Sequence, residues 1–306
     1  MTSILTNGAA LTVLQNINQV QRDLEATQGR ISSGMRVKSA ADNAAYWSIA
    51  TTMRSDNSSL SSVKDALGVG SATLDVASSA LNSTVDIVSQ IKAKLVAARE
   101  PGLDRAKVQA EIGQLQNTLK SISDAASFSA ENWLSQDSSI AGYNANKTIV
   151  ASFSRTTTEV SVGTIDLDTS SMKLFDSNDQ SGIVDRDRTI GGTTISLATI
   201  DISALTDSTA DQQTLDDFIS IADQALGDIS TAASSIGSAR HRVSMQQDFV
   251  STLMDSITTG IGQLVDADMT RESTRLQALQ AQQQLGIQSL SIANSSSQQI
   301  LKLFGG

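Results

Sequence analysis

The single histidine of the chain is the residue best suited to general acid or base catalysis. His241 lies between Arg240 and Arg242, and imidazole is the side chain that most often transfers protons near neutral pH. A catalytic triad would also need a nucleophile and an orienting carboxylate. No Ser or Asp spacing around His241 identifies such a triad. We therefore expect His241 to have a solvated or packing role.

Three carboxylates near the carboxyl end could form a metal site or an acid/base cluster. Asp266, Asp268 and Glu272 lie close together, with Arg271 among them. Carboxylate oxygens bind hard cations and transfer protons. At the start of a helix, however, the same charges are explained more simply by the helix dipole. We predict no catalytic, cofactor-binding or metal-binding residue, and no cofactor.

The composition excludes several other kinds of site. No GxxxxGK[ST] or GxGxxG sequence follows a strand pattern, so no phosphate cradle is expected. The 306 residues contain no cysteine, which excludes disulfides, cysteine-ligated metals and a cysteine nucleophile. A formal charge of −10 argues against nucleic acid or an anionic membrane as a partner. We therefore expect a protein that is not an enzyme.

The elements that carry these residues are mostly helices with coiled-coil periodicity. From Leu60 to Ala98 the seam positions recur alternately every three and four residues. Pro101, the only proline, ends this helix, and a second helix from about Asp104 to Ala126 folds back against it. A third helix is expected from Leu226. Its core positions are seven residues apart, at Ile229, Ile236, Val243, Val250, Ile257 and Leu264.

Both chain ends carry a weaker form of the same seam. Thr27, Gln283 and Gly286 occupy positions where a coiled coil favours a large apolar side chain. Helices with so poor a seam are marginal alone in water, so we expect them to fold against another surface. The predicted self-assembly residues are Ile17, Val20, Leu24, Ile31, Leu276, Leu279, Leu290, Ile300 and Phe304.

The middle of the chain differs from both halves. Residues 140–205 contain Thr and Ser clusters, Gly191-Gly192 and short alternations such as Thr148 to Phe153, which are typical of strands and turns. The predicted fold class is mainly α: an elongated rod of long coiled-coil helices formed by both chain ends, with a small β-rich insert in the middle. The predicted division is residues 1–43 with 266–306 as terminal inner-core helices, 44–139 with 206–265 as a helical bundle, and 140–205 as a variable outer insert.

The length of the first bundle helix sets the expected shape. A helix from about Ala44 to Ala98 would be roughly 80 Å long, whereas a compact globule of this chain length would be about 50 Å across. Such a helix does not fit inside a globule. A rod with weak seams at both chain ends is more typical of an assembly subunit than of an enzyme.

A run of residues near the amino end closely resembles the amino-terminal signature of bacterial flagellins. From Arg30 to Ala45 it reads Arg-Ile-Ser-Ser-Gly-Met-Arg-Val-Lys-Ser-Ala-Ala-Asp-Asn-Ala-Ala, and similar matches lie at Ser238 to Val243 and Gln298 to Leu303. The residues that carry the signature are Arg30, Ser33, Gly34, Arg36, Ser39, Ala40, Asp42, Asp266, Asp268 and Glu272. The short insert is similar to that of flagellins from alphaproteobacteria.

The resemblance implies a structural subunit that polymerises into the bacterial flagellar filament used for swimming. In that family the terminal helices line the inner tube, are disordered in the monomer, and fold on polymerisation. The implied partners are further copies of this chain, other flagellin subunits, an export chaperone, a filament cap and hook-junction proteins.

The resemblance also implies an extracellular location reached by type III export without a cleaved signal peptide. Met1 to Leu14 lacks the basic and apolar regions of a Sec-type signal. No stretch approaches the roughly 20 apolar residues of a membrane helix.

The chain departs from the family pattern near the signature. Asn43, followed by Tyr46-Trp47, replaces a second Asp followed by Gly-Leu. Local packing is therefore expected to differ there.

A second departure lies in the segment that Toll-like receptors read in many flagellins. The family pattern resembles Gln-Arg-Val-Arg-Glu-Leu, but here Ile91 replaces the first arginine and Lys94 replaces the acid. The receptor-facing residues carried over from the family are Gln90, Ile91, Leu95 and Glu111. We expect weak receptor activation.

Two other readings of the sequence are possible. A hook-filament junction protein shares the terminal architecture of a flagellin, and seed elongation would separate the two. A cytoplasmic helical signalling rod, such as a chemoreceptor hairpin, is also acidic and heptad-patterned. The Thr- and Gly-rich stretch from Lys147 to Leu205 does not favour the signalling rod.

Overall fold

The computed structural model describes residues 7–156 and 158–304, with side chains up to residue 295. The chain divides into two compact units, which are unit 1 (Met1–Asn57 with Asp255–Gly306) and unit 2 (Ser58–Met254). Two long helices, α2 (Ala44–Ala97) and α4 (Thr209–Val265), contribute residues to both units. Unit 1 thus joins the two ends of the chain, and unit 2 holds the middle.

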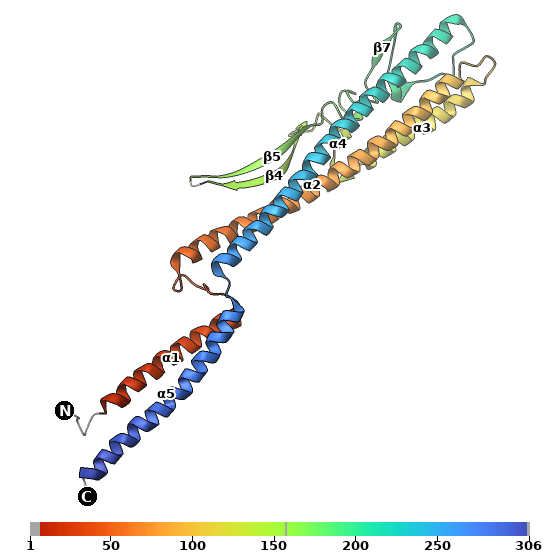
Figure 1. Ribbon diagram of the computed structural model, residues 1–306. Helices are drawn as coiled ribbons and strands as arrows, with labels where there is room; N and C mark the ends of the chain where they lie inside the picture. Colours follow the sequence, from red (N-terminus) through yellow and green to blue (C-terminus); the bar gives the residue numbers. More distant parts are fainter. Residues whose placement is uncertain (1–6, 157, 305–306) are drawn as a thin grey trace. The chain divides into compact units, whose positions relative to one another are not determined.

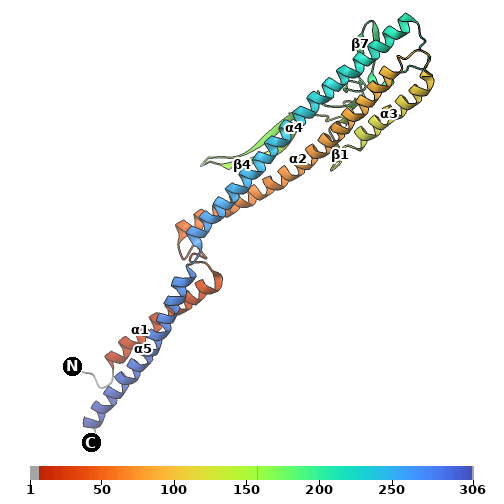
Figure 2. The same cartoon turned by 45° about the vertical axis from the view of Figure 1, so that its right-hand side comes forward.

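In unit 2, α2 and α4 lie beside α3 (Arg105–Ala125) as a helical bundle (Figures 1 and 2). The apolar seams predicted from the sequence form its core, because these side chains are removed from water where the helices meet. On α2 the fully buried side chains include Leu67, Leu74, Leu81, Ile91 and Leu95. On α4 they include Ile229, Ile236, Val243 and Val250. The predicted bundle is confirmed.

The turn between α2 and α3 lies where the sequence places it. Gly102 follows the single proline with a φ of +81°, which glycine adopts without strain. Asp104 caps α3 by accepting a hydrogen bond from the Lys107 backbone N–H at 3.3 Å. Arg105 is buried and donates to the Ala98 carbonyl at 3.0 Å, so it satisfies an acceptor at the end of α2.

Helix α4 begins at Thr209, well before the expected start at Leu226. Its early turns bury Leu215, Phe218, Ala222 and Ala225, which continue the alternation of three and four residues. The seam therefore extends further toward the amino end than the strict seven-residue spacing indicated.

The segment between α3 and α4 is β-rich, as predicted, although its strands begin before residue 140. Its strands, in the described residues, form two-stranded sheets that are antiparallel except for the parallel pair β3 and β6. Their bounds are β1 (Ser127–Phe128), β2 (Glu131–Asn132), β3 (Ser135–Gln136), β4 (Asn146–Arg155), β5 (Val160–Asp168), β6 (Phe175–Asp176), β7 (Arg188–Ile190) and β8 (Thr193–Ile195), followed by a short 3₁₀ helix, η1 (Leu197–Thr199). The mainly α fold class with a small β-rich middle is confirmed.

The insert is held to the bundle by side chains of α3 and by a close contact on α2. The Gln109 side chain donates to the Ile200 carbonyl at 3.1 Å and accepts from the Ile202 N–H at 3.0 Å. Gln116, two turns on, donates to the same Ile200 carbonyl at 3.0 Å. On α2, the hairpin residue Ile149 lies directly over Gly70, where a Cβ would be only 2.6 Å from its Cγ2 atom.

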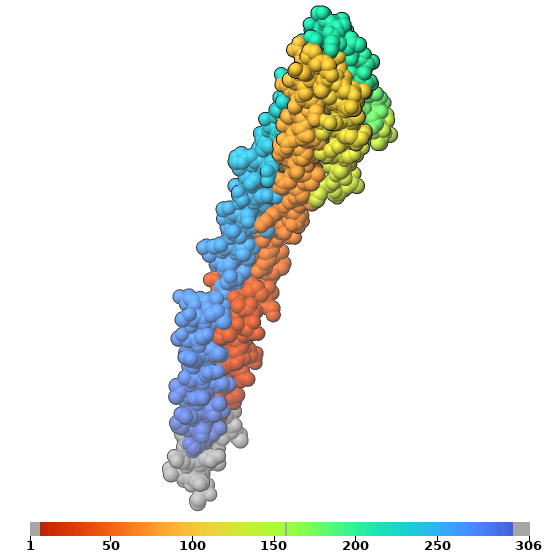
Figure 3. All heavy atoms as spheres, turned by 90° about the vertical axis from the view of Figure 1, so that its right-hand side faces the viewer, coloured from red at the N-terminus to blue at the C-terminus, as the bar shows by residue number. Residues whose placement is uncertain are grey.

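In unit 1, α1 (Gly8–Ser33) and α5 (Met269–Phe304) lie side by side (Figures 1 and 3). A small apolar cluster follows them, formed by Val37, Ala50 and Val265 with Ile261 and Leu264 packed against it. The two ends of the chain are thus brought together by helix packing rather than by a sheet.

Candidate functional site

The seam between α1 and α5 is the site at which the two chain ends meet. Thr27 on α1 and Leu279 on α5 are buried, at 1% and 7% exposed. Leu279 belongs to the predicted self-assembly set. Six further members of that set are half-buried, namely Ile17, Val20, Leu24, Ile31, Leu276 and Leu290. The side chains of Ile300 and Phe304 lie outside the described residues. Because the seam closes within one chain, these residues first serve to pair α1 with α5.

One apparent weakness of the seam is needed for close packing. Gly286 occupies a position where the sequence pattern would favour a large apolar residue, but a Cβ there would lie 2.9 Å from the Cγ1 atom of Ile17. Small residues allow helix backbones to approach closely. Gly286 therefore lets α5 approach α1 at this level.

Polar contacts close the seam at both of its ends. The Asn7 side-chain amide donates to the Ala293 carbonyl at 3.0 Å, while its oxygen caps α1 by accepting from the Ala10 N–H at 3.1 Å. At the other end, the Arg30 guanidinium pairs with Glu272 at 3.4 Å. The second Glu272 oxygen, Oε2, is buried without a hydrogen-bond partner among the described residues.

The signature residues after α1 form a tight connection to the end of α4. Gly34 ends α1 in a left-handed conformation, with a φ of +69°. The backbone N–H groups of Arg36 and Val37 both donate to the Val265 carbonyl, at 2.7 and 3.2 Å. The Ala267 N–H donates to the Gly34 carbonyl at 2.9 Å. These signature positions are therefore explained by backbone geometry and hydrogen bonding.

Asp42 organises the turn before α2. Its carboxylate accepts hydrogen bonds from the backbone N–H groups of Ser39 and Lys38 and from the Ser39 hydroxyl. These bonds, led by that from the Ser39 backbone, lower the pKa of Asp42. Ala40, within the turn, is exposed.

The departure at Asn43 is accommodated locally. Asn43 caps α2 by accepting from the Tyr46 N–H at 3.0 Å. The Tyr46 ring remains 41% exposed, with the Arg36 guanidinium 5.9 Å from its centroid. The neighbouring Trp47 is 37% exposed.

The carboxylates that could have formed a cluster instead have separate structural roles. Asp268 caps α5 by accepting from the Thr270 and Arg271 N–H groups at 3.0 and 3.1 Å. This contact agrees with the interpretation of Asp268 as a helix-terminus charge. Asp266 forms an isolated backbone bridge with Met35. Across residues 7–156 and 158–304, no group of acidic and histidine side chains is arranged to hold a metal ion.

The predicted receptor-facing residues and His241 differ in their exposure to solvent. Ile91 and Leu95 are fully buried in the bundle, whereas Gln90 and Glu111 are exposed. Glu111 forms an ion pair with Lys94, which joins α3 to α2. His241 is exposed on α4. Of the receptor-facing set, only Gln90 and Glu111 present their side chains to solvent.

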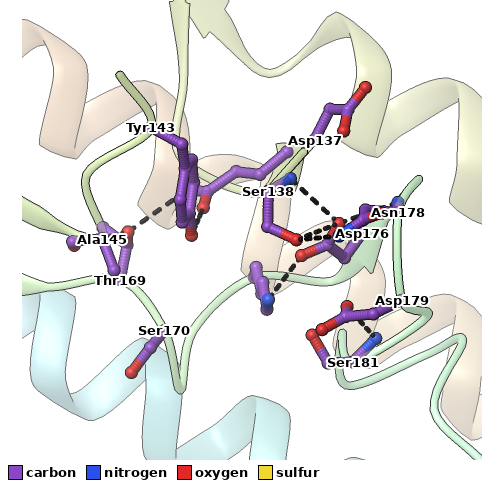
Figure 4. A network of polar contacts seen from close by, with 12 residues as sticks. Asp137, Ser138, Tyr143, Ala145, Thr169, Ser170, Asp176, Asn178, Asp179 and Ser181 are labelled. Carbon is purple, nitrogen blue, oxygen red and sulfur yellow. Dashed lines mark hydrogen bonds and ion pairs between the residues drawn. The ribbon is translucent and has the colours of Figure 1, made fainter. Parts of the chain in front are cut away.

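Sequence reasoning missed a buried polar network in the insert (Figure 4). Lys173 and Asp176 are both buried, with 7% and 1% of their surface exposed. They form an ion pair in which the Lys173 Nζ atom lies 2.5 Å from Oδ2 of Asp176. Asp176 also accepts from the N–H and hydroxyl of Ser138 and from the Asn178 N–H. Burial by itself raises the pKa of Asp176. The hydrogen bonds, of which the one from Lys173 has the largest effect, outweigh burial and hold this pKa well below its ordinary value. These contacts hold β6 and the residues that follow β3 together within the insert.

A second missed contact holds the insert to α4. The buried Arg188 donates to the Ile183 carbonyl at 2.7 Å and to Asp228 at 2.8 Å, and Arg186 pairs with the same carboxylate. The only sequence signal for it was the pair of arginines two residues apart beside a strand.

None of the helices in the described residues is both long and apolar enough to cross a membrane.

Comparison with known proteins assigns the chain to a family. Residues 4–139 match the model for the bacterial flagellin N-terminal helical region, and residues 219–304 match that for the C-terminal helical region. Flagellin C of Rhizobium meliloti strain 1021 is 48% identical, over 99% of both chains. Flagellin A of the same strain is 41% identical over 99% of this chain and 100% of its own. A flagellin of Brucella melitensis biotype 1 is 40% identical over 100% of both chains.

The matched helical regions contain both partners of the α1–α5 seam and most of the bundle. Flagellins are structural proteins, and their close match over the whole chain agrees with a fold in which the polar residues cap helices and bridge elements. The chain therefore belongs to the bacterial flagellin family and is a structural subunit of the flagellar filament.

Proposed function

We propose that the paired helices α1 and α5 form the surface through which one subunit binds the next in the filament. The observation that carries this proposal is the set of large apolar side chains that stay exposed after the seam has closed. They are Leu11, Leu14, Leu285, Ile287 and Ile292, exposed at 56, 43, 61, 57 and 68%. Exposed apolar residues in such number on two helices indicate an interaction surface.

The energy for assembly comes from burying these side chains between neighbouring subunits. Complete burial of one Leu or Ile contributes about 1.5 to 3 kcal/mol. Ordering the helices offsets part of this gain, as in other coupled folding and binding. The seam residues, including Ile17 and Leu279, contribute by holding α1 and α5 in the paired form.

Elongation of short filament seeds by the purified chain, followed by electron microscopy, tests the proposal. Leu285→Gln and Ile292→Gln should abolish elongation and leave the helix content unchanged. Gln280→Ala, an exposed polar change on the same helix, is the matched control and should elongate seeds normally. Elongation by both glutamine variants at the unmodified rate would exclude this surface.

The division of the chain into domains and the partners in the filament form part of the same proposal. The division into inner-core helices (1–43 and 266–306), a bundle (44–139 and 206–265) and an outer insert (140–205) follows the order of the elements along the chain. Flagellins A, B, C and D of Rhizobium meliloti strain 1021 are all similar to this chain. Other flagellin subunits are therefore proposed as filament partners beside further copies of the chain.

We further propose export through the type III apparatus without a cleaved signal, to an extracellular filament. The export chaperone, the filament cap and the hook-junction proteins are its proposed partners. No catalytic role is proposed. Detection of the intact amino terminus, beginning at Met1 or Thr2, in sheared filaments would support export without cleavage.

Weak activation of Toll-like receptors remains a prediction. Its support is that Glu111, an exposed residue of the segment, is already paired with Lys94, the residue that replaces an acid. A cell reporter assay with purified monomer tests it, and full potency would contradict it.

A further inference from the structure

The amino end of α1 contains the only Asn-Gly dipeptide of the chain, Asn7-Gly8. In such a dipeptide the backbone nitrogen of the second residue can attack the side-chain carbonyl of the first. Glycine favours this reaction because it has no Cβ to obstruct the approach and its backbone is conformationally permissive. Asn7-Gly8 is therefore the position in the sequence best suited to spontaneous deamidation.

The conformation of Asn7 in the paired chain ends prevents this reaction. Asn7 has a φ of −87° and a ψ of 92°. This ψ turns the Gly8 nitrogen to the side of Cα opposite Cβ, so the nitrogen cannot reach Cγ. The side chain is also held at both of its polar atoms, because Nδ2 donates to the Ala293 carbonyl and Oδ1 accepts from the Ala10 N–H. A reactive geometry requires the loss of both contacts and a rotation about ψ of Asn7.

We propose that Asn7 is a deamidation site that is closed while α1 is paired with α5 and open while the two chain ends are apart. In the open state the Gly8 nitrogen forms a bond with Cγ of Asn7, and the side-chain amide leaves as ammonia. Water then opens the resulting cyclic imide at one of its two carbonyls. The products are aspartate or isoaspartate at position 7, with water consumed and ammonia released.

Either product changes the contact that closes the seam. An aspartate keeps the oxygen acceptor for the Ala10 N–H but has no donor for the Ala293 carbonyl. A carboxylate facing a carbonyl oxygen is repelled. An isoaspartate also adds a methylene to the backbone, which displaces the cap from the first turn of α1. Deamidation therefore accumulates on unpaired chain ends and opposes their later pairing.

Peptide mapping by mass spectrometry of the full-length chain, incubated at mildly alkaline pH, tests the proposal. The rate at Asn7 should be about tenfold lower in filaments elongated from short seeds, where α1 and α5 are paired, than in the free monomer, whose chain ends are apart. In filaments of Gly286→Ala, where a Cβ contacts Ile17 and weakens the pairing, this protection should be smaller. Gly8→Ala, whose Cβ hinders the attacking nitrogen, should slow the formation of both products in the monomer.

An internal control and the contradicting results are available in the same digest. Asn144, followed by Ala145, lies in unit 2 and should deamidate equally in monomer and filament. Equal rates at Asn7 in filament and monomer would overturn the proposal, and so would the absence of acid at position 7 in both. The comparison rests on the proposed function, and the two failures are distinguishable: a chain that does not elongate seeds contradicts the proposed function, whereas filaments in which Asn7 reacts as fast as in the monomer contradict this proposal.

Discussion

Arg30 and Glu272 lie 242 positions apart in the sequence and form an ion pair of 3.4 Å between α1 and α5. The two side chains are unequally buried, at 34% and 8% exposed. Glu272 also leaves one oxygen buried and without a hydrogen-bond partner in the part of the chain that the structure describes. The pair is therefore asymmetric, since only the arginine can regain its hydration when its partner is lost.

This asymmetry predicts different costs for the two single substitutions. Arg30→Ala leaves a buried carboxylate alone and should lower the free energy of unfolding of the paired ends by about 2 to 3 kcal/mol. Glu272→Gln keeps the shape of the side chain, removes the buried charge, and should cost about 1 kcal/mol or less. Thermal unfolding followed by circular dichroism measures both. The double variant should recover part of the loss of Arg30→Ala, and a fully additive loss would show that the residues do not interact.

Gly286 should tolerate no side chain at the α1–α5 seam. In Gly286→Ala the gain in helix propensity, about 1 kcal/mol, is opposed by the overlap with Ile17, and overpacking costs about 1 to 3 kcal/mol. We expect a net loss of paired helix, relieved by a second substitution, Ile17→Ala. Gly227→Ala on α4 is the matched control, because a Cβ there meets nothing within 4 Å and should stabilise the helix. Equal effects of the two glycine substitutions would contradict the close approach.

A comparable pair of glycines on α2 tests how the β4–β5 hairpin is attached. A Cβ at Gly70 would overlap Ile149, whereas one at Gly68 meets nothing within 4 Å. Gly70→Ala should therefore displace the hairpin and speed amide hydrogen exchange in β4, while Gly68→Ala should leave exchange there unchanged. Hydrogen-exchange mass spectrometry resolves the hairpin from the bundle. Unchanged exchange in Gly70→Ala would show that Ile149 can move aside without cost.

The Lys173–Asp176 pair should make the insert sensitive to acid. Because the folded pKa of Asp176 is lowered, its ionised form stabilises the fold above its unfolded pKa of about 3.9, and this contribution declines as the pH falls toward the folded value. Asp176→Asn should destabilise unit 2 by about 3 kcal/mol at neutral pH. The difference from the unmodified chain should shrink below about pH 4.

Urea unfolding at a series of pH values measures this difference. Asp179→Asn, an exposed neighbouring carboxylate, is the control and should have little effect at any pH. A difference for Asp176→Asn that stays constant down to low pH would contradict an ionised, hydrogen-bonded Asp176.

Local patterns in the sequence were sufficient for the helices and their ends. The seam from Leu60 to Ala98, the break at Pro101 and the start of a helix near Asp104 all lie where they were predicted, because helix periodicity depends on residues three or four positions apart. The start of α4 was predicted too late, because the strict seven-residue spacing begins at Ile229, while the earlier turns follow a looser pattern through Phe218 and Ala222.

The sequence by itself thus determined the helices, their seams, the β-rich middle and, by resemblance, the family. Only the tertiary structure decided which apolar residues close the seam within the chain and which, such as Leu285 and Ile292, stay exposed. It alone shows that Arg30 pairs with Glu272 and Lys173 with Asp176. It also shows that Gly286 is needed for the close approach of α5 to Ile17. The reason is physical: periodicity records which face of an element is apolar, but the partner of that face is chosen by packing between segments far apart in the chain.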